Sequence, residues 1–425
     1  MEMDTGFEMA SSKIRFGRGV TREVGMDFAD MGLKQVLVVT DEQVGQLEVT
    51  ATALKSLEAQ KINFTIFDRT RIEPTDESLQ EAIEFAQPQS FDGFLAIGGG
   101  SVIDTAKTIN LYTTYPADFL DYVNAPIGKN KQIPGAIKPL IAIPTTAGTG
   151  SEATGRIVFD LVKMRAKTGI SSRLIRPTLG IIDPDNTRTL PPQIAASTGF
   201  DVLSHAIESY TAIPFDTRAK PSRPSLRPPY QGSNPISDIW ALEALRLAEK
   251  YLFREVENID DDEARGMMLL AAGFAGMGFG NAGCHLPHAM SYPVSGMVRD
   301  YKPNQYKVKH QLIPHGMSVI LNAPAAFRFS ASGCPERHLQ AAQALGADIS
   351  RAQHADAGKI LSDCLIDYMR KLNMPNGLSA VGYNSDDIPK MVEAVYPQLR
   401  LTSLSPRPVS KDDVQQIFED AINYW

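Results

Sequence analysis

The chain has 425 residues, with 42 Lys and Arg against 49 Asp and Glu, and therefore a formal net charge of −7. At roughly 150 residues per domain this length predicts two or three domains, each large enough to bury a core. A content of 43% hydrophobic and 21% charged residues is that of a globular protein and excludes a disordered or fibrous chain. The mild acidic excess and the lack of a long run of Lys or Arg argue against nucleic acid or an anionic membrane as the main partner.

No targeting signal is visible in the first twenty residues. The first residues include Glu2, Asp4 and Glu8 and no apolar stretch, unlike a secretory signal or a typical mitochondrial transit peptide. Three scattered cysteines do not form a disulfide framework and indicate a reducing compartment. We expect the mitochondrial matrix if the source is eukaryotic and the cytoplasm otherwise.

One uncharged segment resembles a membrane span by composition. No Lys, Arg, Asp or Glu lies between Arg265 and Arg299, but the compact apolar part is only 15 residues, 266–280. Prolines and histidines follow it, so the segment is too short and too interrupted to cross a bilayer. We predict a helix buried inside the protein.

Short apolar runs alternate with helical patterns in the first part of the chain, which predicts a doubly wound parallel sheet. The expected strands are 35–41, 62–68, 93–97 and 140–143, and the expected helices are a segment ending near residue 60, 77–86 and 101–112.

Helical patterns dominate after Asp183-Pro184. We therefore predict an α/β dinucleotide-binding domain over residues 1–185 and an all-α, metal-binding catalytic domain over residues 186–425. A loop over residues 214–235 contains six prolines, and it is either a rigid surface insertion or a functional loop.

Two loops at the ends of predicted strands are candidates for binding a nucleotide. Gly99, Gly100, Ser101 and Asp104 lie at the start of a helix, where backbone N–H groups can approach a pyrophosphate. The run is not a G-x-G-x-x-G fingerprint, and an ordinary strand-to-helix turn explains it as well.

The second loop, 144–152, contributes Thr145, Thr146 and Thr149, which could bind phosphate, ribose and the nicotinamide amide or simply cap the next element. Asp41, after the first predicted strand, is placed to bind an adenosine ribose and to repel a 2′-phosphate. This pattern predicts NAD rather than NADP.

A set of N and O donors predicts a divalent transition metal. Asp201 and His205 are four residues apart, which places both on one face of a helix. His285, His288 and His315 follow downstream, although each histidine alone is more often a core or surface residue. Cys284 is more typical of a buried structural thiol.

Together, these motifs resemble the iron-containing (group III) alcohol dehydrogenase family over nearly the whole chain. The resemblance implies a dehydroquinate synthase-like fold, NAD as cofactor, Fe²⁺ or Zn²⁺ as metal, and Lys167 near the nicotinamide ribose. His285 falls outside the family pattern, and Tyr292 stands where many members have a histidine. The metal ligands that it implies are Asp201, His205, His288 and His315.

Three segments resemble more narrowly the hydroxyacid-oxoacid transhydrogenase branch of that family: Glu73-Pro74-Thr75-Asp76, 119–123 and 230–240. That resemblance implies oxidation of 4-hydroxybutyrate and reduction of 2-oxoglutarate through a bound NAD. The alternative is an alcohol dehydrogenase that releases NAD at every turnover. A non-catalytic scaffold is a further alternative, but it has no need for an Asp/His/His/His set.

Acidic substrates require a cation near the metal. Arg227, Arg299, Lys302 and Lys307 are the candidates, and each is equally well explained as a solvated surface charge. We expect small hydroxy acids and oxo acids as partners, no nucleic acid or membrane, and a homo-oligomer.

Overall fold

The computed structural model describes residues 2–164 and 166–425. It divides the chain into two compact units. The sheet unit consists of Ser11–Leu190 and Ile259–Gly276, and the helical unit consists of the chain up to Ala10, Pro191–Asn258 and Met277–Trp425. The N-terminal segment thus belongs to the helical unit, and Ile259–Gly276 belongs to the sheet unit, although chain order alone would suggest the reverse.

The sheet unit contains a six-stranded, wholly parallel sheet in the order β1-β8-β5-β4-β2-β3. Its strands are β1 (Lys13–Phe16), β2 (Gln35–Val39), β3 (Asn63–Phe67), β4 (Gly93–Gly98), β5 (Leu140–Pro144) and β8 (Leu179–Ile182). A separate antiparallel pair is formed by β6 (Arg156–Leu161) and β7 (Ala166–Ser171). The parallel sheet is confirmed, whereas β1, β6, β7 and β8 were not predicted.

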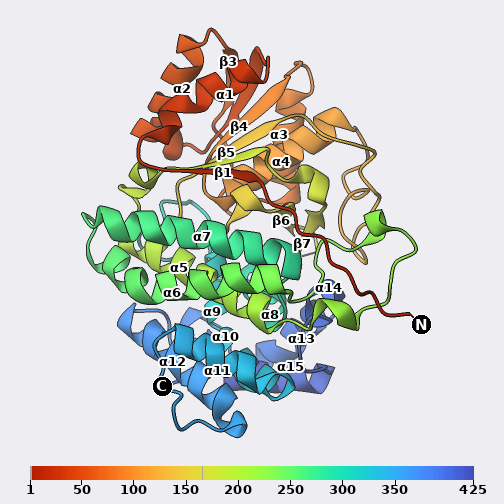
Figure 1. Ribbon diagram of the computed structural model, residues 1–425, viewed down its shortest axis with the longest axis vertical. Coiled ribbons are helices and arrows are strands. Elements are labelled where there is room, and N and C mark those ends of the chain that lie inside the picture. The colour runs from red at the N-terminus through yellow and green to blue at the C-terminus, as the bar shows by residue number, and fades with distance from the viewer. Residues whose placement is uncertain (1, 165) are drawn as a thin grey trace. The chain divides into compact units, whose positions relative to one another are not determined.

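Helices cover both faces of this sheet (Figure 1). On one face Val36 and Val38 of β2 pack with α1 (Val24–Asp30) and α2 (Glu48–Ala59). On the other face Leu37 and Val39 pack with α3 (Asp76–Ala86) and α4 (Gly100–Thr114). Successive side chains of a strand point to opposite faces, so a strand buried on both sides is a continuous apolar run.

The strand order reverses next to β2. The chain passes from β2 to β3 at one edge of the sheet and then returns to β4 on the other side of β2. Parallel α/β sheets bind ligands at the carboxyl ends of the strands at such a switch point. The segments that follow β2 and β4 contain Asp41 and Gly99.

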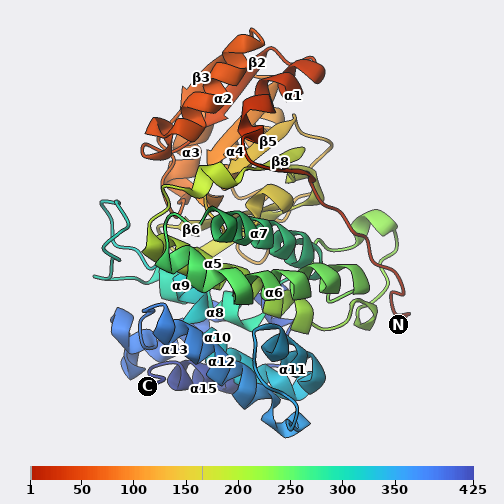
Figure 2. The same cartoon turned by 60° about the vertical axis from the view of Figure 1, so that its left-hand side comes forward.

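The helical unit consists mostly of helices, as expected (Figure 2). They are α5 (Pro192–Thr211), α6 (Pro235–Glu257), α8 (Leu286–Gly296), α9 (His315–Ile320), α10 (Ala323–Ser330), α11 (Pro335–Ala344), α12 (Ala357–Lys371), α13 (Ile388–Val395), α14 (Leu399–Thr402) and α15 (Lys411–Asp420). Helix α7 (Asp262–Ala282) includes residues of both units. Helix α5 is buried along most of its length and packs against α6 and α9.

The proline-rich loop is attached to the N-terminal segment by side-chain and backbone hydrogen bonds, and Asp4 makes several of them. Asp4 accepts hydrogen bonds from Arg218 Nη2 at 2.8 Å and from both Nε and Nη2 of Arg227 at 2.9 Å. Arg218 and Arg227 therefore both pair with Asp4 and hold the loop against the N-terminal segment.

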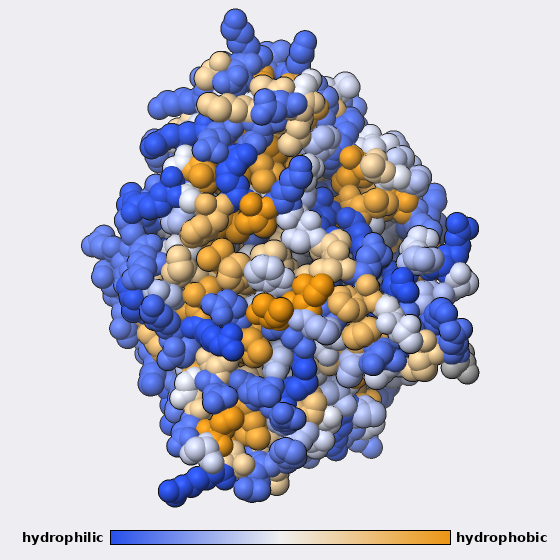
Figure 3. All heavy atoms as spheres, in the orientation of Figure 1, coloured by the Kyte–Doolittle hydropathy of each residue, from blue (hydrophilic) through white to orange (hydrophobic). Residues whose placement is uncertain are grey.

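Among the described helices, no single one is long and apolar enough to span a membrane. Helices α7 and α8 together have the required length and apolar composition, but the pair is bent by 105°. Helix α8 is almost wholly buried within the protein. On the face drawn in Figure 3, hydrophobic residues form several small groups interrupted by hydrophilic ones.

Candidate metal and cofactor sites

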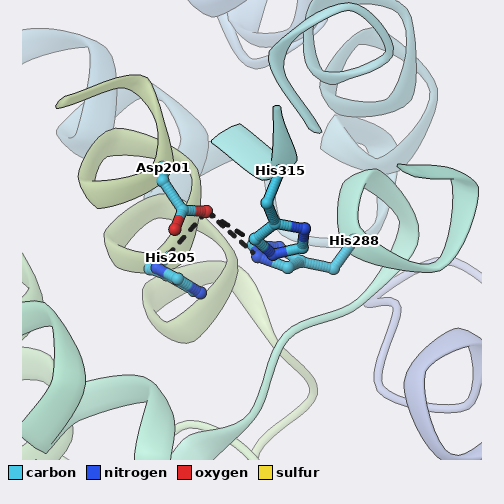
Figure 4. Close-up of side chains that lie close together, drawn as sticks. All are labelled: Asp201, His205, His288 and His315. Carbon is cyan, nitrogen blue, oxygen red and sulfur yellow. Dashed lines mark ion pairs between the residues drawn. The ribbon is translucent and has the colours of Figure 1, made fainter. Parts of the chain in front are cut away.

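Four side chains of the helical unit converge on one point: Asp201, His205, His288 and His315 (Figure 4). Each offers one ligand atom, and these atoms all lie within 4.8 Å of one another. The Oδ1 atom of Asp201 lies 3.7 Å from His205 Nδ1, 3.5 Å from His288 Nε2 and 3.8 Å from His315 Nε2. The structure thus brings together the four ligands that the family resemblance implies, from chain positions up to more than a hundred residues apart.

Three helices supply these residues. Asp201 and His205 are one turn apart on α5, His288 lies in the first turn of α8, and His315 begins α9. The glycine after His315 allows this approach, because a Cβ on Gly316 would lie 2.0 Å from the carbonyl oxygen of Ser197 and 2.9 Å from Asp201 Cβ. The Pro-His-Gly motif therefore packs α9 against α5 closely enough to place His315 beside Asp201.

The spacing and the hydrogen bonding of this set fit a metal ion. Tetrahedral ligands about 2.1 Å from an ion are about 3.4 Å apart, near the observed separations and too far for hydrogen bonds. Asp201 Oδ1, His205 Nδ1 and His288 Nε2 are buried and have no hydrogen-bond partner. Buried polar atoms normally have a partner, so a shared cation accounts for all three.

Protonation of the set is consistent with this role. Burial lowers the pKa of His205 to about 3, so its imidazole is neutral at pH 7. Burial alone would raise the pKa of Asp201, but His205 and His315 outweigh it and hold the pKa well below its usual range. An ionised carboxylate and a neutral imidazole are the forms that bind a metal.

Glu208 orients one of the histidines and was missed as a functional residue, although it belongs to the same helix motif as Asp201. Its Oε2 contacts His288 Nδ1, and its Oε1 accepts the backbone N–H groups of His285 at 2.7 Å and His288 at 3.2 Å. A proton held on Nδ1 leaves the lone pair of Nε2 available to a metal ion. The Glu208 carboxylate also outweighs burial and raises the pKa of His288, so metal and proton compete for Nε2.

His285 and Cys284 lie beside the set without belonging to it. His285 is fully buried and its Nε2 shares a hydrogen bond with Thr211 Oγ1 at 2.9 Å. Burial lowers the pKa of His285 to about 4. Cys284 is buried and lies near Glu208 and His288. Both residues therefore pack around the predicted ligands.

The two predicted nucleotide loops lie against each other in the sheet unit. A Cβ on Gly99 would lie 3.2 Å from Thr146 Oγ1, and a Cβ on Gly100 would lie 2.6 Å from Thr149 Cγ2. The glycines are thus required by the close approach of the threonine loop. Helix α4 begins here without a side-chain cap, which leaves its first N–H groups available to an anion.

Two other predicted cofactor residues are engaged within the protein. Asp104 Oδ1 accepts from Ser151 Oγ at 2.7 Å, its Oδ2 accepts from the N–H of Val158 at 2.9 Å, and Lys107 Nζ lies 3.4 Å away. Ser101 Oγ accepts the N–H of Glu73 at 3.1 Å. Asp104 therefore connects α4 to the threonine loop and to β6, and its contact with the cofactor stays a prediction.

Lys167 and Asp41 also have internal partners. Lys167 Nζ is buried between Glu73 Oε2 at 2.8 Å and Asp160 Oδ2 at 3.1 Å. Burial lowers the pKa of Lys167, but the two carboxylates outweigh it and raise the pKa above its usual value. Asp41 Oδ1 accepts the N–H groups of two following residues at 2.9 Å. Their roles at the ribose stay predictions.

The four cations proposed for the substrate differ in their surroundings. Arg227 is paired with Asp4, and Arg299 Nη2 lies 2.5 Å from Asp387 Oδ2. Lys302 and Lys307 are exposed. Arg227 and Arg299 thus already have carboxylate partners within the protein.

Comparison with known proteins identifies the family. Residues 11–184 match the iron-containing alcohol dehydrogenase family, and residues 230–422 match the C-terminal domain of the Fe-containing alcohol dehydrogenase family. The chain belongs to the iron-containing alcohol dehydrogenase family. It is therefore related to oxidoreductases that bind a metal and NAD(H).

The similarity extends over almost the whole chain. Hydroxyacid-oxoacid transhydrogenase, mitochondrial, from Bos taurus is 54% identical over 99% of this chain and 91% of that protein. The protein of the same name from Homo sapiens is 53% identical, with the same shares covered. Among solved structures, an archaeal halo-thermophilic alcohol dehydrogenase from a Red Sea brine pool is 27% identical with a TM-score of 0.85, covering 99% of this chain and 100% of that one.

Proposed function

We propose that the chain is a hydroxyacid-oxoacid transhydrogenase. The observation that carries this proposal is its similarity, over 99% of its length, to proteins of that name. In the proposed reaction 4-hydroxybutyrate is oxidised to succinate semialdehyde and 2-oxoglutarate is reduced to 2-hydroxyglutarate, one hydride passing between them by way of bound NAD. The proton released in the first half is taken up in the second, so the reaction is balanced without an external oxidant.

Asp201, His205, His288 and His315 would hold a divalent ion, Fe²⁺ or Zn²⁺. When bound, such an ion polarises a hydroxyl or carbonyl oxygen as a Lewis acid. The contribution of the protein is to gather one carboxylate and three imidazoles at the distances given above. Glu208 holds the His288 ring in the orientation and tautomer that direct Nε2 to the centre.

In the sheet unit, the N-terminus of α4 and the threonine loop would hold NAD. The residues concerned are Gly99 and Gly100 at the helix and Thr145, Thr146 and Thr149 in the loop. Asp41 lies at the switch point, where its charge disfavours a 2′-phosphate. We expect a lower KM for NAD than for NADP in an assay with added cofactor. A preference for NADP would contradict this role of Asp41.

For the compartment we propose the mitochondrial matrix, since the relatives are named as mitochondrial proteins, and for the assembly a homo-oligomer. Fractionation of cells that produce the chain with a C-terminal tag would test the first, and sedimentation equilibrium the second.

The function is tested by turnover without added NAD. Purified, metal-loaded protein is mixed with 4-hydroxybutyrate and 2-oxoglutarate, and 2-hydroxyglutarate is followed over many turnovers. Product formation at many times the protein concentration supports a retained cofactor. Turnover only with added NAD would instead favour an alcohol dehydrogenase that releases its cofactor. The variant Asp201→Asn serves as the control for metal-independent background.

A further inference from the structure

A guanidinium group that was not among the cations considered from the sequence contacts the helix that carries the predicted ligand His288. Arg400, on α14, donates a hydrogen bond from Nη2 to the hydroxyl oxygen of Tyr292 at 2.9 Å. Its Cζ lies 6.0 Å from the centre of the Tyr292 ring. Tyr292 follows His288 by four residues on α8, so the two side chains share a helix face about 6 Å apart along the axis.

Arg400 has no acidic partner among the residues that the structure describes. Its one side-chain hydrogen bond there is the one to Tyr292, and none of the ion pairs of the described chain includes it. Burial lowers the pKa of Arg400, but the phenols of Tyr292 and Tyr230 outweigh it and raise the pKa further. The half-buried guanidinium is therefore charged at every physiological pH.

Two buried lysines are paired with carboxylates, whereas the buried Arg265 donates hydrogen bonds to three backbone carbonyl oxygens. Lys167 lies between Glu73 and Asp160, and Lys107 contacts Asp104. A partly desolvated charge without a counter-ion is unfavourable. A group of this kind near a site is a candidate for binding a ligand that supplies the opposite charge.

The chemistry of the guanidinium specifies the ligand. Arginine has five N–H donors in a planar fork that matches the two oxygens of a carboxylate. The bond to Tyr292 uses one of these donors and fixes the group. Helix α14 packs on α8, which carries both Tyr292 and the predicted ligand His288.

We propose that Arg400, positioned by Tyr292, binds the carboxylate shared by the hydroxy-acid and oxo-acid substrates. This inference rests on the proposed function and extends it to substrate choice. The reacting hydroxyl or carbonyl group is directed toward Asp201 and the three histidines, while the carboxylate is held at the other end. Because both substrates carry a carboxylate, one cation serves both halves of the reaction and selects acids over simple alcohols.

The test compares Arg400→Met with two matched variants. Arg407→Met removes an arginine of the same unit that packs on Phe329, and Arg299→Met removes the cation proposed from the sequence. For each protein we would measure KM and kcat for 4-hydroxybutyrate and 1-butanol, the Kd of succinate by calorimetry, the metal content and the Tm. Succinate binding requires no turnover, so it decides the matter even if 1-butanol is not a substrate.

Loss of a charge-assisted, two-point contact predicts that Arg400→Met raises KM for 4-hydroxybutyrate and Kd for succinate by about 10- to 100-fold. We expect metal content and Tm to be retained, and 1-butanol turnover and the Arg407→Met variant to stay close to wild type. Equal losses on 1-butanol and 4-hydroxybutyrate, or a loss in Arg299→Met instead, would overturn the inference.

Arg400→Lys provides a second variant in case Arg400→Met does not fold. It keeps the charge but lacks the planar fork, so we expect a smaller rise in both constants, by about 3- to 10-fold. Wild-type constants in a folded Arg400→Lys protein would count against the inference. If the wild-type protein turned over no hydroxy acid, the proposed function would fail, while the succinate measurements would still decide whether Arg400 binds a carboxylate.

Discussion

One buried polar set in the sheet unit and one in the helical unit differ in whether their atoms have hydrogen-bond partners. In the sheet unit, Asp104 and Lys107 are buried together, and their charged atoms contact each other, Ser151 and backbone groups. In the helical unit, Asp201 and His205 present buried atoms without a hydrogen-bond partner. The first set is complete within the protein, whereas in the second, the incomplete set, a bound cation would satisfy the buried atoms. Unsatisfied atoms on converging side chains therefore distinguish the predicted metal site from the buried pair of Asp104 and Lys107.

The largest effect is expected from a change within the incomplete set. Asp201→Asn keeps the shape of the side chain but removes the one negative charge among the four predicted ligands. We expect metal affinity to fall more than 100-fold, beyond the roughly 10- to 100-fold range of indirect contacts, and activity to fall with it. Metal content by mass spectrometry after dialysis measures this. Wild-type metal content in the variant would contradict the prediction that this set binds a metal.

A change within the complete set should act on folding instead. Lys107→Met removes the ammonium and leaves the buried Asp104 carboxylate without its cation. We expect the free energy of unfolding to fall by about 3–5 kcal/mol, with metal content retained at temperatures where the protein is folded. Urea titration followed by circular dichroism measures the first. If the variant lost metal while its unfolding free energy stayed unchanged, the two units would not differ as described.

An intermediate effect is expected from Glu208, which contacts a predicted ligand without joining the set. Glu208→Gln keeps a hydrogen-bonding group beside His288 but removes the charge that holds the Nδ1 proton. We expect metal affinity to fall about 10- to 100-fold. Competition with a chelator of known affinity measures the change. As a control, Glu336→Gln alters an exposed carboxylate of α11 and should leave metal affinity unchanged.

Local patterns in the sequence predicted four of the six strands of the parallel sheet and part of the metal site. Short runs rich in apolar residues predicted β2, β3, β4 and β5, and the i, i+4 spacing placed Asp201 and His205 on one helix face. The strands β1, β6, β7 and β8 were missed. In β1, β6 and β7 polar and apolar side chains are mixed, so no apolar run marks them, whereas β8 is a buried apolar run of only four residues.

The sequence by itself determined which residues could bind a metal, because donor type and local spacing are properties of neighbouring residues. Only the tertiary structure decided how those donors come together and which other groups assist them. Glu208 orients His288 because α5 packs near α8, and Arg400 reaches Tyr292 because α14 packs on α8. Such contacts join residues 80 and 108 positions apart. No periodicity along a chain records a distance of that kind, since the folding of the intervening helices sets it.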